Sequence, residues 1–90
     1  MTGSKMIKSA LESMLFVWGQ LLPAKEAATI LDITEKKSIK YFKELMSEYE
    51  QEDRGIRIRR VNKSFQFVTH EDNEEFIKRL CTYSDRKSVV

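Results

Sequence analysis

The sequence predicts a small α+β domain, mainly α-helical, of the winged helix-turn-helix class. Three observations support this prediction: three successive helical patterns, a tight turn between the second and third, and a hairpin-like segment over residues 54–69. The expected order is helix, short bridge strand, helix, helix, strand, wing, strand and helix. Ninety residues suit one domain. We expect residues 1–81 to form it, and residues 82–90 to be a flexible tail or the start of a linker to an absent second domain.

The composition is that of an ordinary soluble globular domain, with 41% hydrophobic and 33% charged residues. No apolar run approaches the ~20 residues that a membrane span requires, and the first residues lack a signal-peptide core. We therefore expect a cytoplasmic protein without membrane contact. Cys81 is the only cysteine, which excludes an intrachain disulfide. The net charge of +2 does not by itself indicate a partner.

The first helix is predicted from Ser4 to Trp18, because apolar residues recur there at helical spacing. Gly19 follows as a left-handed stop. The main apolar stripe comprises Ile7, Leu11, Met14, Leu15 and Trp18.

A second set of apolar residues lies off this stripe. Either the helix is buried on several sides of a small core, or a second face meets another subunit. The candidate dimer or partner interface therefore consists of Phe16, Val17, Met6 and Ala10.

The second helix is predicted from Pro23 to Leu31, since proline is well suited to the first helical position. Thr34 follows a tight turn and is the expected N-cap of a third helix, which runs from Glu35 to about Asp53. The predicted inward stripe of this third helix comprises Ile39, Phe42, Leu45, Met46 and Tyr49.

The hairpin is predicted to begin after Gly55. In its first strand, Ile56 and Ile58 are expected to point inward and the intervening arginines outward. Val61 breaks this alternation, which predicts a bulge or a twist near Arg60. The turn lacks the glycine that a tight hairpin prefers, so we expect a longer or mobile wing tip.

The second strand and a fourth helix complete the predicted domain. Phe65 and Phe67 are expected to share one face of the strand. The fourth helix is predicted over residues 71–80, with acidic residues in its first turn that suit the helix dipole. Its predicted apolar face comprises Phe76, Ile77 and Leu80.

The residues offer little for catalysis or metal binding. One histidine and one cysteine cannot supply a structural zinc site, and there is no glycine-rich phosphate loop. His70 is interpreted as a surface residue and Cys81 as a small packing residue. We therefore predict that the chain is not an enzyme, that it holds no metal or cofactor, and that it binds no small-molecule ligand.

The charges of the third helix oppose its dipole, with lysines in the first half and acids in the second. Helix stability does not explain this arrangement. In a winged helix, the first half of this helix and the wing face a nucleic acid together. Three interpretations remain open: nonspecific DNA phosphate contact, docking of an acidic protein segment, or a solvated basic face. The candidate residues are Lys36, Lys37, Lys40, Lys43, Arg57, Arg59 and Lys63.

Two segments resemble the segregation and condensation protein B family. The run from Lys8 to Gly19 is similar to the opening helix of that family, and Pro23 to Ala28 fills the place of its next helix. The segment from Tyr49 to Thr69 is similar to the family's hairpin pattern, in which Arg54-Gly55-Ile56, Val61, Phe65 and Thr69 match.

The resemblance covers about residues 6–80 and departs from the family pattern in two ways. Lys63 and Ser64 stand where members usually carry glycine at the wing tip. Members also have two winged-helix domains in tandem, and only the first has a counterpart in this sequence. This chain is therefore expected to retain dimerisation better than kleisin binding, which in the family rests heavily on the second domain.

The resemblance implies a non-catalytic subunit of the bacterial SMC–kleisin complex for chromosome condensation and segregation. Members form homodimers and bind the kleisin subunit, segregation and condensation protein A, so the implied protein is cytoplasmic and nucleoid-associated. The alternative function is that of a winged-helix DNA-binding protein, either a transcription regulator or a nonspecific nucleoid protein.

Overall fold

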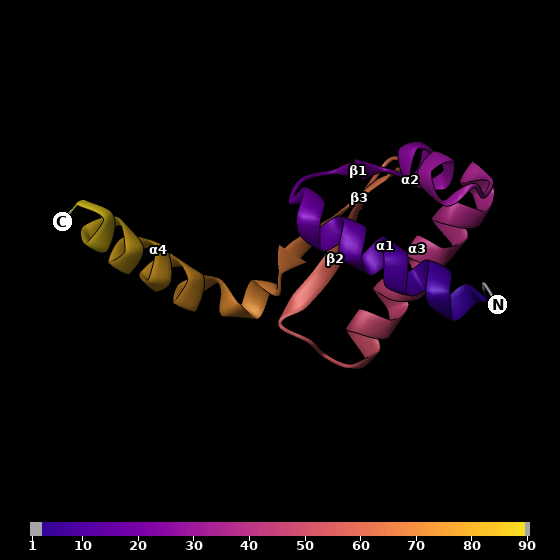
Figure 1. Ribbon diagram of the computed structural model, residues 1–90. Coiled ribbons are helices and arrows are strands. Elements are labelled where there is room, and N and C mark those ends of the chain that lie inside the picture. Colours follow the sequence, from indigo (N-terminus) through magenta and orange to yellow (C-terminus); the bar gives the residue numbers. More distant parts are fainter. Residues whose placement is uncertain (1–2, 90) are drawn as a thin grey trace.

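The computed structural model describes the backbone of residues 3–89 and the side chains of residues 3–83. A helical body carries a small antiparallel sheet, and the last helix projects away from it (Figure 1). The predicted winged helix-turn-helix order is confirmed. The elements are α1 (Ser4–Trp18), β1 (Leu22–Pro23), α2 (Ala24–Leu31), α3 (Glu35–Gln51), β2 (Ile56–Val61), β3 (Ser64–Thr69), the short 3-10 helix η1 (Glu71–Asn73) and α4 (Glu74–Val89).

The helix ends follow local backbone chemistry. Gly19 ends α1 in the left-handed conformation, with φ 73°, and its N–H donates to the Leu15 carbonyl at 3.3 Å. The Thr34 hydroxyl accepts from the Lys37 N–H at 3.1 Å, as predicted for the N-cap of α3.

Two predicted helix boundaries were wrong by one or two residues. Pro23 belongs to β1 and is the extended N-cap of α2, so the helix begins at Ala24. At the other boundary, α3 ends at Gln51 because Asp53 adopts a left-handed φ of 51°.

The core lies between α1, α2, α3 and the sheet. The rings of Phe42 on α3 and Phe65 on β3 stack with centroids 4.4 Å apart, and both side chains are 0% exposed. Small residues on α2 allow it to pack closely against α3. Ser38 is also fully buried, although its position was not part of the predicted stripe. The buried apolar residues are Leu11, Leu15, Leu22, Ala24, Ala27, Ala28, Phe42, Leu45, Tyr49, Ile58 and Phe65.

The strand order is β1-β3-β2, and all neighbouring strands are antiparallel. Of the two distortions predicted near Arg60, the bulge is wrong, because pairing continues without interruption to Val61 opposite Ser64, and the twist stays a prediction. The longer wing tip is also wrong. The strands are joined by the two residues Asn62 and Lys63, and Asn62 supplies the positive φ of 57°.

A backbone contact holds the wing tip against the helical body. The N–H of Ala24, in the first turn of α2, donates to the Lys63 carbonyl at 2.8 Å. N–H groups in the first turn of a helix have no acceptor within the helix, so the Lys63 carbonyl supplies the acceptor for the Ala24 N–H.

The outer end of the hairpin differs from the prediction. Ile58 is buried as expected, and Phe65 and Phe67 share the face that meets the core. Ile56 was expected to point inward but is exposed. It is the first residue of β2, opposite Thr69, where the sheet extends beyond the core.

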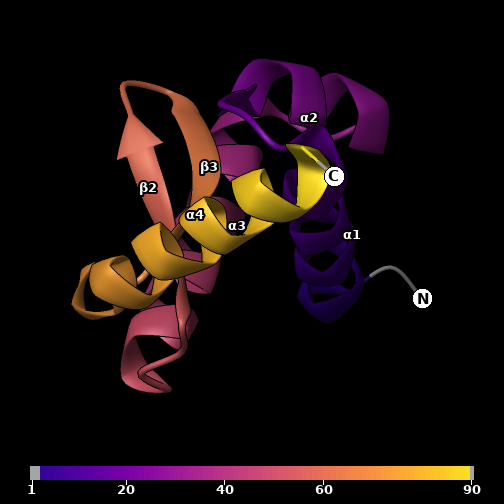
Figure 2. The ribbon, with the colours of Figure 1, turned by 90° about the vertical axis from the view of Figure 1, so that its left-hand side faces the viewer.

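The last helix was predicted to begin at Glu71 and end at Leu80, and both bounds were wrong. Residues 71–73 form η1, and α4 continues to Val89. Ion pairs four residues apart support the helix: Lys78 with Glu74 at 3.6 Å and Arg79 with Glu75 at 2.6 Å. Figures 1 and 2 show α4 leaving the body, so its predicted apolar face does not pack on the core. Whether residues 82–90 link to a further domain stays a prediction.

Polar contacts connect the outer side of α1 to α3. The Tyr49 hydroxyl donates to the Glu12 carboxylate, and the Lys8 ammonium group contacts Glu48 and lies 3.6 Å from Glu44. Burial, together with the contact to Glu12, raises the pKa of Tyr49 to about 12.

Replacing Phe42 by Ala should destabilise the domain by about 3–5 kcal/mol, because it removes a fully buried ring and leaves a cavity beside Phe65. Urea unfolding followed by circular dichroism would measure the loss. Ile30→Ala is the control, since this side chain is 69% exposed and should change stability by less than ~0.5 kcal/mol. Equal effects of the two substitutions would contradict the assignment of the core.

Tyr49 should ionise near pH 12, whereas an ordinary tyrosine ionises near pH 10. The folded state holds this proton more tightly than the unfolded state, so the stabilisation is complete below pH 10 and is lost as the pH rises through about 12. Phenolate absorbance titration of the wild type and of Tyr49→Phe would isolate this one group among the three tyrosines. A wild-type titration in which every tyrosine ionises near pH 10 would disprove the contact with Glu12.

Candidate partner-binding surface

The C-terminal end of α1 exposes large apolar side chains. Phe16 is 79% exposed and Val17 is 80% exposed, because Leu11 and Leu15 turn the opposite side of the helix to the core. Of the two sequence interpretations for this second apolar set, the structure favours a free outer face over burial. Other exposed apolar residues of the body are Met6, Trp18, Leu21, Ile30 and Ile56.

The four residues predicted for this interface do not form a single cluster. Phe16 and Val17 lie together at the end of α1. Met6 is exposed, but it lies ten residues before Phe16, which is about 15 Å along a helix. Ala10 is only half-buried and lies between the two ends. The surface therefore concentrates at the C-terminal end of α1.

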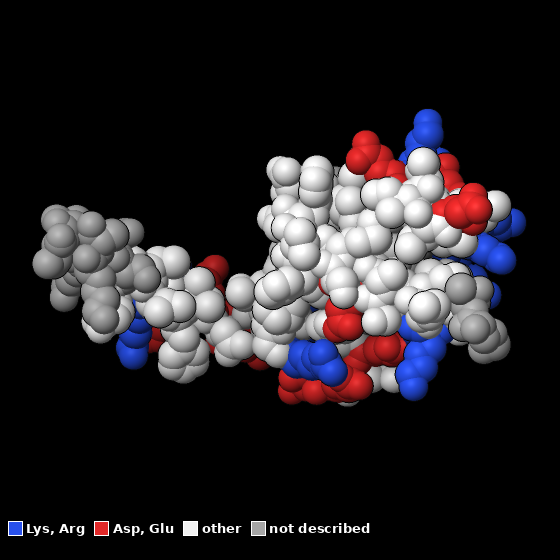
Figure 3. Space-filling view, viewed as in Figure 1, with Lys and Arg blue, Asp and Glu red and all other residues white. Residues whose placement is uncertain are grey.

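A hollow of about 790 Å³ lies beside this end of α1, between the end of α3 and the outer end of the hairpin. Such a volume is in the range of sites that accept ligand or side-chain groups. In Figure 3 the surface over the C-terminal end of α1 is white, and charged side chains appear only beside and below it. The apolar residues that line the hollow are Leu15, Phe16, Val17, Ile56 and Phe67.

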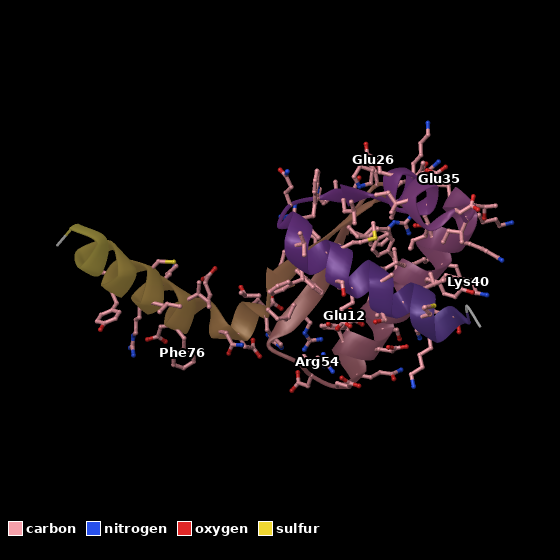
Figure 4. All side chains as sticks on the ribbon, in the orientation of Figure 1. Glu12, Glu26, Glu35, Lys40, Arg54 and Phe76 are labelled. Atoms are coloured by element: carbon pink, nitrogen blue, oxygen red, sulfur yellow. The ribbon has the colours of Figure 1, made fainter. Side chains whose placement is uncertain are left out.

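Polar groups occupy the rim of the same hollow. Tyr49, Glu12 and Arg54 all line it. The Arg54 guanidinium lies 4.7 Å from the centre of the Tyr49 ring, and its Nε donates to Glu52 at 2.5 Å. Figure 4 shows Glu12 and Arg54 near each other below α1. The rim thus carries one anionic and one cationic group next to an apolar floor.

A smaller hollow of about 340 Å³ lies on the other side of α1, against α2. Ser13 and Val17 line both hollows and form the ridge between them. The Trp18 indole donates to the Leu21 carbonyl at 3.1 Å, which holds the connection to β1 in place. The smaller hollow is lined by Ser13, Met14, Val17, Trp18, Leu22, Glu26 and Ile30.

The basic face predicted on α3 forms a separate surface. Its four lysines are exposed and line a hollow of about 690 Å³ along the helix. Figure 3 shows basic side chains at that end of the body, and Figure 4 labels Lys40 there. The lysines in question are Lys36, Lys37, Lys40 and Lys43.

The hairpin residues predicted for the basic face have different surroundings. Arg57 donates to the Asp53 carboxylate at 2.8 Å, and its side chain is only 22% exposed. It is therefore already paired with an acid. Arg59 and Lys63 are exposed.

The single histidine, His70, is the N-cap of η1. The Nδ1 atom of His70 accepts from the Asp72 N–H at 3.0 Å, which caps η1, and its Nε2 lies 3.5 Å from Asp53. Cys81 is exposed rather than packed, so its predicted role was wrong, because α4 does not lie on the body. Among the described residues, no three metal-ligating side chains cluster, and no helix has the length and apolarity to cross a membrane.

Several lining residues were not predicted from the sequence. Ile56 was placed in the core, while Glu12 and Arg54 had no assigned role. The signal for Arg54 and Ile56 was the Arg54-Gly55-Ile56 motif, and Glu12 lies in the run from Lys8 to Gly19; both segments supported only the resemblance. The rim is assembled from α1, the end of α3 and the segment before the hairpin, and α1 is far from the other two in the chain, so helical spacing alone could not reveal it.

The sequence matches the family "Segregation and condensation complex subunit ScpB" over residues 9–89. It is 30% identical over 82 residues to segregation and condensation protein B of Clostridium acetobutylicum, covering 91% of this chain and 41% of the relative. The protein of the same name from Alkaliphilus oremlandii is 34% identical over 84 residues, covering 93% and 45%. The chain thus spans less than half the length of these relatives.

Several solved structures are similar to this fold, among them two of ScpB proteins. ScpB from Mycobacterium tuberculosis matches with a TM-score of 0.88 at 16% identity, covering 94% of this chain and 53% of that one. A dimer of the ScpB N-terminal domain complexed with a ScpA peptide matches with a TM-score of 0.78 at 26% identity, covering 84% and 95%. The predicted resemblance is therefore confirmed, and the chain belongs to the ScpB family of segregation and condensation complex subunits.

Proposed function

We propose that this chain is a non-catalytic part of the bacterial chromosome segregation and condensation complex, acting mainly as a homodimerising scaffold. The observation that carries the proposal is the exposed apolar surface at the end of α1, beside a hollow with an apolar floor. A monomeric domain seldom leaves several large apolar side chains together in water. Its partners would be a second copy, the kleisin ScpA and, through the family, SMC, in the cytoplasm at the nucleoid.

The similar N-terminal domain supports both partners. That domain is a dimer and is complexed with a ScpA peptide, and this chain covers 95% of it. The correspondence indicates that a domain of this size suffices for dimerisation and for a kleisin contact. This correspondence argues against the expectation that kleisin binding by this chain depends heavily on a second domain. Phe16 and Val17 are the proposed centre of the interface, with Met6 and Ala10 at its edge.

Phe16→Asp should convert a dimer to a monomer at micromolar concentration, because it places a charge within a desolvated apolar contact. Sedimentation equilibrium measures the mass. Thr29→Asp is the control: it adds the same charge at an exposed position of α2 and should leave the mass unchanged.

A ScpA peptide added to the wild-type chain should increase the sedimenting mass. A wild-type chain that is strictly monomeric would refute the scaffold proposal. A dimer that fails to bind the peptide would refute the kleisin contact alone.

A second candidate function, nonspecific DNA contact, rests on a different observation. Four lysines line one side of α3 in the half of the helix that faces DNA in winged-helix proteins. Lysine contacts phosphate without strong base discrimination, so the expected binding is independent of sequence.

If the basic face binds DNA, random duplex should bind at about 50 mM salt and largely dissociate by about 200 mM, because counterions are released on binding. Fluorescence anisotropy measures both states. Substituting Lys36, Lys40 and Lys43 by Glu should abolish binding, whereas the same change at Lys5, Lys25 and Lys78 provides a charge-matched control. Equal losses in the two triple variants would contradict a specific basic face, and no binding at low salt would contradict DNA contact altogether.

A further inference from the structure

The chain is more extended than a compact domain of its length. Its radius of gyration is 15.3 Å, against about 12 Å for a compact domain of 90 residues. Its accessible surface is 6833 Å², whereas a compact monomer of this size exposes about 5,500 Å². The excess of about 1,300 Å² is larger than the ~800 Å² that each partner covers in a standard interface.

Much of this extension comes from α4, which carries an apolar stripe. Phe76 is 62% exposed and Leu80 is 58% exposed, with Ile77 half-buried between them. In the described residues the main neighbour of α4 is η1, immediately before it in the chain. Figure 4 shows Phe76 pointing away from the body. Helices of about this length are marginal in water when no apolar face is covered.

A second uncovered apolar surface lies on the side of the body from which α4 departs. The hollow beside Phe16 includes Ile56, and Ile56 pairs with Thr69 at the end of β3, just before η1. Figure 1 shows α4 extending outward from this side, and in the view of Figure 2 it lies in front of the body. No described residue of α4 lines the hollow, so the helix does not cover the hollow of its own chain.

We propose that two copies of this chain exchange α4, so that the apolar stripe of each α4 packs into the hollow beside Phe16 of the other copy. The proposal rests on the proposed homodimer and specifies its contact surfaces. When the two bodies face each other across a two-fold axis, each hollow receives α4 of the other copy. The assembly then closes at two subunits. Each copy thereby covers an apolar helix face and an apolar hollow that it leaves open by itself.

The charges near the two surfaces are compatible with this contact. On α4, the Glu75 carboxylate and the Arg79 guanidinium form an ion pair at 2.6 Å, so neither would enter the contact as an unpaired charge. The rim of the hollow offers Glu12 and Arg54, one of each sign. Both flanks are therefore balanced, and packing the stripe need not bury an unpaired ion.

Cys81 allows a direct test, because it is the only cysteine and follows Leu80 on α4. One chain carries Ser13→Cys with Cys81→Ser, which places its single thiol on the wall of the hollow. The other chain is wild type. Mixing the two under mild oxidation should give mainly a mixed disulfide dimer, in which the thiol at position 13 of the variant is joined to Cys81 of the wild type. Mass spectrometry identifies it, and no intrachain disulfide can form, since each chain has one thiol.

A second variant tests the same contact without cross-linking. Leu80→Glu should weaken the dimer by at least about tenfold in Kd, because it places a charge in the proposed interface. Any loss of helix content by circular dichroism should be limited to α4, and the body should stay folded, since Leu80 is not part of the buried core. Lys78→Glu, on the same helix, is the control and should leave Kd unchanged.

The outcomes separate this proposal from the one on which it rests. A dimer that survives Leu80→Glu overturns the exchange and leaves the homodimer intact. A disulfide between two copies of the Ser13→Cys variant, formed in place of the mixed disulfide, likewise overturns the exchange and leaves the homodimer intact. A wild-type chain that is monomeric in sedimentation overturns both proposals. Loss of the dimer with Leu80→Glu, together with the mixed disulfide, supports the exchange of α4.

Discussion

The stacked rings of Phe42 and Phe65 are the contact on which the rest of this structure depends. They join the middle of α3 to the first part of β3, and therefore join the helical half of the domain to the wing. Leu11 and Leu15 of α1 belong to the same buried cluster. Because this core is thin, each helix can bury only one narrow side, and the core contact decides which side that is.

The uncovered surfaces follow from this constraint. With Leu15 in the core, Phe16 and Val17 necessarily face outward at the end of α1. The hairpin runs past the core, so Ile56 reaches the rim of the hollow and α4 begins beyond the body. The apolar end of α1, the hollow and the root of α4 therefore occur together on one side, which is where a second copy is proposed to bind. The basic face of α3 is separate from this surface.

The sequence predicted local features well where one residue type determines the backbone. Gly19 and Thr34 have their expected roles because a left-handed stop and a hydroxyl N-cap depend on neighbouring atoms only. The prediction failed where distant contacts decide. The missing glycine at the wing suggested a loose tip, but the Ala24 N–H holds the Lys63 carbonyl, and this contact links two segments far apart in sequence.

The sequence by itself determined the order of elements, the family and the identity of most buried residues, because apolar spacing and capping residues act locally. The tertiary structure alone decided which apolar residues remain outside. The pattern of α4 is that of a helix that packs on its own body, yet Phe76 and Leu80 are exposed. The same helical spacing of apolar residues is found in a helix that packs on its own core and in a helix that packs on another chain. Only the direction in which the chain leaves β3 distinguishes them.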